Sequence, residues 1–473
     1  MSEHEDRGRP EEEPQVPEEP RGRADGDARA PAGAEARADG EPEAPTGAED
    51  RADGDARATA EEPARGTRQP APGPSRSAQF VRDLLSGSWL VTVLAIFIAL
   101  VLSGVLIAGA DARVQDAAGY FFARPTDMLG AAWDAVSASY TALFRGSIFD
   151  YQATSFARAI RPLTETMVFS VPLVFTGLGI ALAFRAGMFN IGGQGQIIAG
   201  AIVGGYIGFG MNLPVVLHLI LAVLGAALGG AIYGGIAGVL KARTGANEVI
   251  VTIMLNNIAV YLIAWLLTQP AFQQPDSNLP RSPYVEATAL YPTLLGPPFR
   301  LHLGFLLMIA VTALVWWLVE RSTFGFELRA VGANPEAART AGVSVSKVII
   351  VAMLVAGALS GLGGSAQVLG TEGLLTAGVA ASYGFDAITV ALLGRARAWG
   401  TLAAGLLFGA LKAGGFLMQS TTQTPIDIIL VMQSIIVLLI AAPPLVRAIF
   451  RLPAPRPGRR QRSVLEAQEV AAA

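Results

Sequence analysis

The chain has 473 residues, of which 52% are hydrophobic, 8% aromatic and only 15% charged. Soluble globular domains carry about 25% charged residues, so this composition indicates a membrane protein. There is no cysteine, which excludes a disulfide framework, an iron–sulfur cluster and a thiolate nucleophile. The three histidines are too few and too scattered for a His-rich metal centre, and we expect no metal site: His4, His218 and His302.

The net charge of −3 is divided unevenly along the chain. Residues 1–80 hold 20 acidic and 11 basic side chains, whereas residues 81–473 hold 18 acidic and 24 basic ones. The first segment consists mainly of Glu, Pro, Ala, Gly and Arg and cannot bury enough apolar surface to offset its chain entropy. We therefore expect a disordered acidic tail over 1–80, a transmembrane domain over 81–450 and a basic-to-polar tail over 451–473.

Long runs with few or no charges follow the acidic tail. A helix that crosses the ~30 Å hydrocarbon core needs about 20 apolar residues, because no water is available there to bond exposed backbone groups. The sequence therefore predicts an all-α polytopic membrane protein with about ten transmembrane helices. They cover 89–110, 166–184, 186–240 (two spans, divided at 211–214), 249–268, 301–319, 348–370, 373–394, 401–418 and 428–446.

The basic residues between these runs give an orientation, since cytoplasmic segments near helix ends accumulate Lys and Arg. With a cytoplasmic N-terminus, the inner connections carry 19 Lys and Arg and the outer connections 7. We therefore expect both termini in the cytoplasm. The weakest span is 373–394, where Ser382-Tyr383-Gly384 and Asp386 are also compatible with a broken or re-entrant helix. Removing this span would place the Arg-rich C-terminal tail outside, so we retain it.

Two further patterns concern helix packing and the outer connections. Glycines recur four residues apart, and small residues let helix backbones approach closely in lipid. We expect contacts within the chain, rather than dimerisation, at Gly200, Gly204 and Gly208; Gly225 and Gly229; Gly230, Gly234 and Gly238; Gly357 and Gly361; and Gly405 and Gly409. The connection 111–161 mixes charged and aromatic residues, which is compatible with helices lying along the outer interface or with a polar loop.

Polar side chains inside apolar spans are costly and are therefore candidates for a substrate pathway. The stretch 190–196 (NIGGQGQ) opens one span; its glycines permit an irregular backbone, and its amides suit either a neutral polar solute or interhelical bonds. The span 249–268 contains two adjacent amides, Asn256 and Asn257, which cannot both face lipid. At least one of them must therefore face a cavity or another helix. The candidate pathway residues are Asn190, Gln194, Gln196, Asn256, Asn257, Gln367, Tyr383 and Asp386. We expect Glu165, Lys412 and Asp427 to be interfacial ion partners instead.

A short helix is predicted in the cytoplasmic segment 321–347. Asn334-Pro335-Glu336 makes a helix start, with proline in the first turn and an acid near the positive end of the helix dipole. Gly342 ends the helix. Alanines on one face and charges on the other suit docking into a groove of a soluble partner, although an ordinary surface helix has the same pattern. The chain contains no G-x-x-x-x-G-K-[ST] phosphate loop, so we expect no ATP hydrolysis in this chain. Its residues assemble neither a catalytic Ser/His/Asp arrangement nor a metal-ligand cluster, so we expect no other enzymatic activity.

These motifs resemble those of importer permeases energised by ATP-binding cassette (ABC) subunits. Glu336-Ala337-Ala338 followed by Gly342 resembles the family's coupling loop, although Ala352-Met353-Leu354-Val355 departs from its Ile-x-Leu-Pro ending. The stretches 189–196 (FNIGGQGQ), 327–342 and 383–415 resemble the branched-chain amino acid and ribose permease family, in its nucleoside or simple-sugar branch. The resemblance covers about residues 89–446. It implies that Glu336, Ala337, Ala338 and Gly342 couple the chain to an ATPase.

The resemblance also implies a function and partners. The chain is expected to be the permease subunit of a nucleoside importer in the bacterial cytoplasmic membrane, working by alternating access. The ATPase subunit would bind ATP and magnesium, so no cofactor is expected in this chain and no nucleic acid as partner. A second permease subunit, identical or different, and an extracellular substrate-binding lipoprotein complete the assembly. The alternatives are a sugar or branched-chain amino acid permease, a passive channel, or a proton-coupled transporter that uses Asp386 or Glu248.

Overall fold

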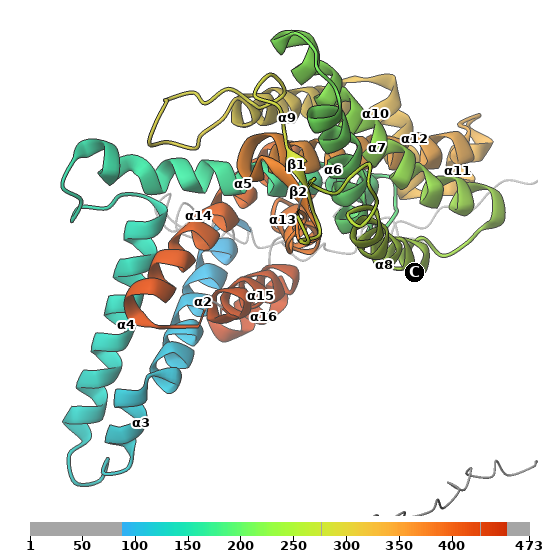
Figure 1. Ribbon diagram of the computed structural model, residues 1–473. Helices are drawn as coiled ribbons and strands as arrows, with labels where there is room; N and C mark the ends of the chain where they lie inside the picture. The colour runs from blue at the N-terminus through green and yellow to red at the C-terminus, as the bar shows by residue number, and fades with distance from the viewer. Residues whose placement is uncertain (1–87, 276, 426, 452–473) are drawn as a thin grey trace, which may run out of the picture. The chain divides into compact units, whose positions relative to one another are not determined.

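The computed structural model describes residues 88–275, 277–425 and 427–451. The tail predicted over 1–80 lies outside this range, as does the tail predicted over 451–473 apart from Arg451. The described part is mostly helical, as predicted, with one small sheet (Figure 1). Its elements are α2 (Ser88–Ala110), α3 (Ala112–Ala118), α4 (Pro125–Ser147), α5 (Phe156–Arg185), α6 (Gly193–Gly210), α7 (Val215–Thr244), α8 (Glu248–Leu266), β1 (Arg281–Tyr284), α9 (Gly304–Arg321), α10 (Thr323–Ala333), α11 (Pro335–Thr340), α12 (Val345–Ser365), the π-helix η1 (Ala366–Glu372), β2 (Leu374–Thr376), α13 (Tyr383–Leu393), α14 (Ala398–Thr422), α15 (Asp427–Ala441) and α16 (Pro443–Ile449).

Seven helices in the described residues are long and apolar enough to cross a membrane: α2, α5, α7, α8, α9, α12 with η1, and α14. Each coincides with a predicted span. The predicted span at 186–210 forms α6, which is not among these seven helices. The predicted span at 428–446 forms the shorter α15 and part of α16, with a break at Ala442. A stripe on α7 leaves Leu224, Leu228 and Ile232 about 60% exposed, as expected of a lipid-facing surface.

The bundle has two ends, and the helix α12 runs from one to the other. The coupling end is formed by residues 321–345, with α10 and α11. The strand end is formed by residues 281–303 and 372–376, where β1 pairs antiparallel with β2. At about 1.5 Å per residue, α12 and η1 together are long enough to cross a bilayer between these ends.

The predicted span 373–394 is not a single helix, so its treatment as an uninterrupted span is wrong. Its only helix is α13, with 11 residues, which reach about 17 Å and cannot cross ~30 Å of hydrocarbon. The segment still connects both ends: Leu374 pairs with Tyr284 at the strand end, and Ala396 accepts a hydrogen bond from Arg185 at the coupling end. Residues 377–382 between β2 and α13 are not helical. The broken-helix alternative therefore describes this segment.

The glycine faces pack within the chain, as predicted. A Cβ at Gly230 of α7 would overlap the carbonyl oxygen of Gly357 on α12, and a Cβ at Gly200 of α6 would overlap the Cα of Gly361. The backbones of α6, α7 and α12 are therefore in direct contact. On the opposite side of α5, Gly409 of α14 lies against the backbone of Thr166.

The connection 111–161 is helical, which decides against the polar-loop alternative. Asp111 caps α3, its carboxylate accepting from the backbone nitrogens of Arg113 and Val114. The longer helix α4 buries small residues against α14, where Gly146 contacts Gly414, while Trp133 is 73% exposed. In Figure 1, α4 runs beside α2, and the hydroxyl of Tyr140 donates to the carbonyl of Leu100.

Candidate functional site

Two interrupted segments of the bundle meet at one side chain, Gln194. The first is the non-helical stretch 186–192 between α5 and α6, and the second is 377–382 before α13. The amide Nε2 of Gln194 donates to the carbonyl of Ala381 at 2.6 Å, and its Oε1 accepts from the backbone nitrogen of Gly384 at 3.0 Å. The first turn of a helix lacks partners for its N–H groups, so Gln194 satisfies one of those of α13. The starts of α6 and α13 are thereby joined.

The other amides of the 190–196 stretch satisfy the first interruption. Asn190 is fully buried; its Oδ1 accepts from the backbone nitrogen of Gly192 at 2.9 Å and from Nε2 of Gln196 at 3.2 Å. Ser360 of α12 donates to Oε1 of Gln196 at 3.1 Å. Non-helical backbone at membrane depth persists only where the protein itself bonds it, and these side chains supply that bonding.

The two adjacent asparagines of α8, Asn256 and Asn257, have different surroundings, as the sequence requires. Asn256 is buried; it donates to the carbonyl of Ile191 at 2.9 Å and accepts from the backbone nitrogen of Gly195 at 2.8 Å. Asn257 is exposed and bonds only within its own helix, to Ile253. Asn256 therefore joins the same network, whereas Asn257 lies apart from it.

The remaining candidates lie around the start of α13. Asp386 pairs with Lys412 of α14 at 2.8 Å, and both side chains contact the hydroxyl of Ser382. The Lys412 nitrogen also lies 5.0 Å from the ring centre of Tyr383, whose hydroxyl bonds the side chain of Gln367. Lys412 is thus an ion partner, as predicted, but inside the bundle. Glu165 pairs with Arg300 at 2.6 Å at the strand end.

The predicted coupling helix forms α11. Asn334 caps it, its Oδ1 accepting from the backbone nitrogens of Glu336 and Ala337 at 3.0 and 3.1 Å. Ala338 is buried against the bundle, whereas the side chains of Glu336 and Arg339 are 76% and 65% exposed and form an ion pair at 2.9 Å.

Gly342 follows α11 with φ +86°, a conformation that glycine adopts without strain, as the predicted helix end requires. The helix therefore presents Glu336 outward from the coupling end, between its capping residue and this glycine.

The preceding helix α10 connects α11 to the amide network. Gly332 of α10 lies directly against the turn after α5: a Cβ there would overlap the carbonyl oxygen of Arg185 and lie 3.0 Å from the nitrogen of Gly187. Gly187 in turn precedes Asn190 by three residues. A displacement of α10 would therefore act on the stretch that carries Gln194.

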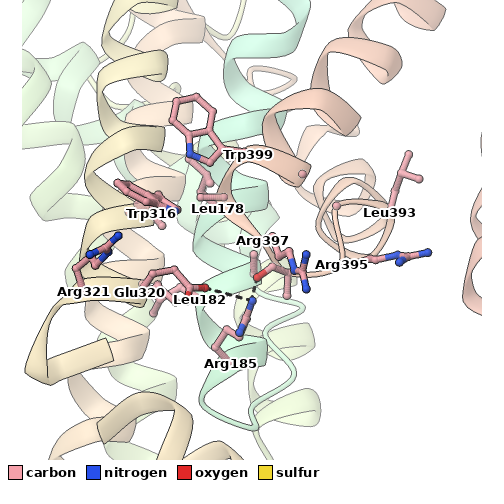
Figure 2. A pocket seen from close by; sticks show the side chains of 17 residues that line it. Leu178, Leu182, Arg185, Trp316, Glu320, Arg321, Leu393, Arg395, Arg397 and Trp399 are labelled. Carbon is pink, nitrogen blue, oxygen red and sulfur yellow. Dashed lines mark hydrogen bonds and ion pairs between the residues drawn. The ribbon is translucent and has the colours of Figure 1, made fainter. Parts of the chain in front are cut away.

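A cleft of about 870 Å³ opens beside this turn, between α5, α9 and the α13–α14 connection (Figure 2). Its lining is rich in arginine, and Arg185 reaches across it to Glu320 at 3.7 Å. The other lining cations are Arg321, Arg395 and Arg397, and Trp316 and Trp399 lie above them in the view of Figure 2. The cleft places a concentration of positive charge at the coupling end.

Comparison with protein families gives a match over residues 163–441, to the branched-chain amino acid transport system permease component. The chain belongs to this permease family. The residues of the amide network, the ion pair at Asp386 and the predicted coupling helix α11 of the permease all lie within the matched range.

Three curated relatives illustrate the similarity. A guanosine ABC transporter permease of Bacillus subtilis is 36% identical, over 65% of this permease and 86% of the relative. A glucose ABC transporter permease of Haloferax volcanii is 36% identical (58% and 75%), and a nucleoside ABC transporter permease of Lactococcus lactis is 33% identical (59% and 79%). In each of these organisms a second permease protein is 26% to 27% identical to this chain. No solved structure gives a significant match.

We expect Gln194→Leu to destabilise the permease. Leucine keeps the volume but leaves Ala381 O and Gly384 N without partners, and each buried unsatisfied group costs about 1–3 kcal/mol. The melting temperature of the purified protein in detergent should fall, whereas Gln152→Leu in the exposed connection before α5 should leave it unchanged. Equal melting temperatures for Gln194→Leu and the wild type would remove Gln194 as the link between α6 and α13.

Proposed function

We propose that this permease is the membrane subunit of an ABC importer for nucleosides in the bacterial cytoplasmic membrane, energised by a separate ATPase subunit. The observation that carries the proposal is the contact of Gly332 with the Arg185–Gly187 turn, which links the exposed coupling helix to an interrupted segment inside the bundle. The relatives' names support the substrate class, since two of the three are permeases for guanosine or nucleosides. Because the third relative is a glucose permease, a sugar is the alternative substrate.

The proposed topology has ten crossings with both termini in the cytoplasm. It consists of the seven long helices, α6 with its preceding loop, the interrupted segment 373–393, and α15 together with α16. The arginine-lined cleft at the coupling end supports this orientation, because basic residues accumulate on the cytoplasmic side. The strand end, with residues 269–303, then faces the extracellular binding protein.

The proposed mechanism is alternating access. ATP-driven closure of the ATPase pair moves α11 and α10, and Gly332 transmits this movement to the turn at Arg185 and so to the amide network. The starts of α6 and α13 move together because Gln194 bonds both segments. ATP and magnesium are held by the ATPase, and this chain itself performs no catalysis.

The second permease subunit is proposed to be a different chain. Each of the three organisms contains two permease proteins that match this chain at two distinct levels of identity, 33% to 36% and 26% to 27%. Such pairs are expected when the two halves of a transporter have diverged. The complete importer would then contain two unlike permeases, two ATPase subunits and a substrate-binding lipoprotein.

A proton-coupled mechanism is less well supported by the geometry. The two candidate proton sites, Asp386 and Glu248, are each paired with a lysine at 2.8 Å, Lys412 and Lys241. Each carboxylate is therefore already held by a cation of the chain itself. Reconstitution tests the choice: the assembled importer should accumulate nucleosides only with ATP and an intact ATPase. Accumulation by this chain alone, abolished by a protonophore, would overturn the proposal.

We expect Glu336→Arg to lower nucleoside uptake about tenfold, because it reverses the charge on the exposed face proposed to meet the ATPase. Its ion pair with Arg339 is exposed and contributes little to stability, so the amount of protein in the membrane should not change. Gly342→Asp should act in the same direction through its positive φ. Co-purification measures how much of the ATPase each variant still binds. As a control, Asp127→Arg on α4 also replaces an acidic residue by arginine, but far from α11. Normal uptake by both variants would remove the assignment of α11 as coupling helix.

A further inference from the structure

Two cavities on the strand-end side of the bundle meet at a pair of aromatic rings. The larger, of about 640 Å³, lies at the strand end and is lined by Glu165, Arg300 and Ser420, among others. The smaller, of about 230 Å³, lies next to the start of α13. Phe169 of α5 and Phe416 of α14 line both cavities, and their rings are stacked at 5.6 Å with an interplanar angle of 25°. A solute that entered at the strand end would meet these rings before reaching the amide network.

The smaller cavity contains a buried hydrogen-bond donor without a partner. Gln433 of α15 is only 4% exposed and lines this cavity, yet its Nε2 has no hydrogen-bond acceptor among the described residues. An unsatisfied buried polar group is costly, and native proteins retain few of them. The charged groups nearby are already compensated, since Lys412 is paired with Asp386. The unpaired N–H of Gln433 therefore indicates an uncharged ligand that carries a hydrogen-bond acceptor.

The size and lining of the smaller cavity restrict this ligand further. Its volume is below the ~300 Å³ at which pockets for drug-sized ligands begin, so it suits one planar ring system rather than a whole nucleoside. Aromatic side chains offer stacking, which any nucleobase can use. The larger cavity, with its carboxylate, guanidinium and hydroxyl groups, provides bonding partners for a hydroxylated sugar.

We propose that Phe169, Phe416 and Gln433 form a binding site for the base of the transported nucleoside. The base stacks on the two rings and accepts a hydrogen bond from Nε2 of Gln433, while the ribose remains in the larger cavity near Glu165 and Arg300. The proposal rests on the function proposed above and adds to it the point at which the permease itself holds the substrate. The proposed site also accounts for the open space beside Phe416, whose side chain is 54% exposed although α14 packs against α5.

The test is uptake by the complete importer in proteoliposomes, with saturating binding protein and radiolabelled guanosine, cytidine, ribose or glucose. Phe169→Leu and Phe416→Leu should each lower the maximal rate of nucleoside uptake about fivefold or more, the lower limit expected for loss of base stacking. Phe122→Leu replaces a fully exposed ring and should have no effect. Gln433→Leu should lower the rate as well, but should keep or raise the melting temperature, because it removes an unsatisfied buried amide.

The outcomes separate this site from the proposed function. Nucleoside uptake at the wild-type rate in all three variants would overturn the base site and leave the importer function standing. Uptake of glucose or ribose but of neither nucleoside by the wild type would overturn the nucleoside function, and the base site with it. A lower melting temperature of Gln433→Leu would show that the amide supports the fold, which would remove it from the site.

Discussion

Gly384→Ala is expected to abolish nucleoside uptake and to destabilise the permease by about 3 kcal/mol. A Cβ at this position would overlap the backbone nitrogen and Cα of Gln194, and neither backbone can move without separating the starts of α6 and α13. Both hydrogen bonds of Gln194 would then lengthen. The melting temperature in detergent and the uptake rate of the reconstituted importer measure the two effects.

Gly378→Ala provides the matched control for Gly384. Gly378 lies in the same interrupted segment, but nothing is within 4 Å of an added Cβ. It should therefore leave both melting temperature and uptake close to those of the wild type. If Gly384→Ala behaves like Gly378→Ala, the two interruptions are not in the close contact described above, and the proposed joint movement of α6 and α13 is lost.

The second large effect is expected at Gly332, where alanine should uncouple ATP hydrolysis from transport. The added methyl group would overlap the carbonyl oxygen of Arg185 and force α10 away from the turn after α5. The exposed face of α11 is unchanged, so the ATPase should still bind and hydrolyse ATP. Uptake per ATP hydrolysed should fall about tenfold, equivalent to about 1.4 kcal/mol.

A glycine outside the coupling end gives the comparison for Gly332. Gly109 at the end of α2 has nothing within 4 Å of an added Cβ, so Gly109→Ala should preserve the ratio of uptake to hydrolysis. A normal ratio in Gly332→Ala would exclude this contact as the route from the ATPase to the bundle. Loss of ATPase binding would instead place the effect of the substitution at α11 itself.

The sequence predicts the local features of this protein well. Seven predicted spans coincide with long helices because hydrophobic length alone specifies a membrane helix. The start of α11 is equally local: Asn334 and Pro335 act on backbone groups within a few residues, and the structure has the predicted cap. The glycine faces were also predictable, since spacing along one helix decides which residues share a face.

The interior arrangement could not be predicted, because it depends on partners far apart in the chain. Gln194 and Gly384 are separated by 190 residues, and no periodicity relates them. The break before α13 was visible only as an alternative, because counting charges indicates whether a segment crosses the membrane and not whether its helix is continuous. Gln433 was not singled out, although a glutamine within an uncharged apolar run is a signal that the rule on polar residues in spans would have found. Phe169 and Phe416 carry no signal, since phenylalanine is ordinary in any span.

The backbone contacts among α6, α7 and α12 restrict how the transporter changes shape. Helices that touch through glycine cannot slide or roll past one another without collision, so we expect these three helices to move as one rigid frame, with the start of α13 attached to it through Gln194. We therefore expect the cavities to change through movement between this frame and two helices: α14, which lines both cavities opposite α5, and α15, which lines the smaller one. Cross-linking within the frame would leave turnover intact, whereas tethering α14 to α5 would halt it.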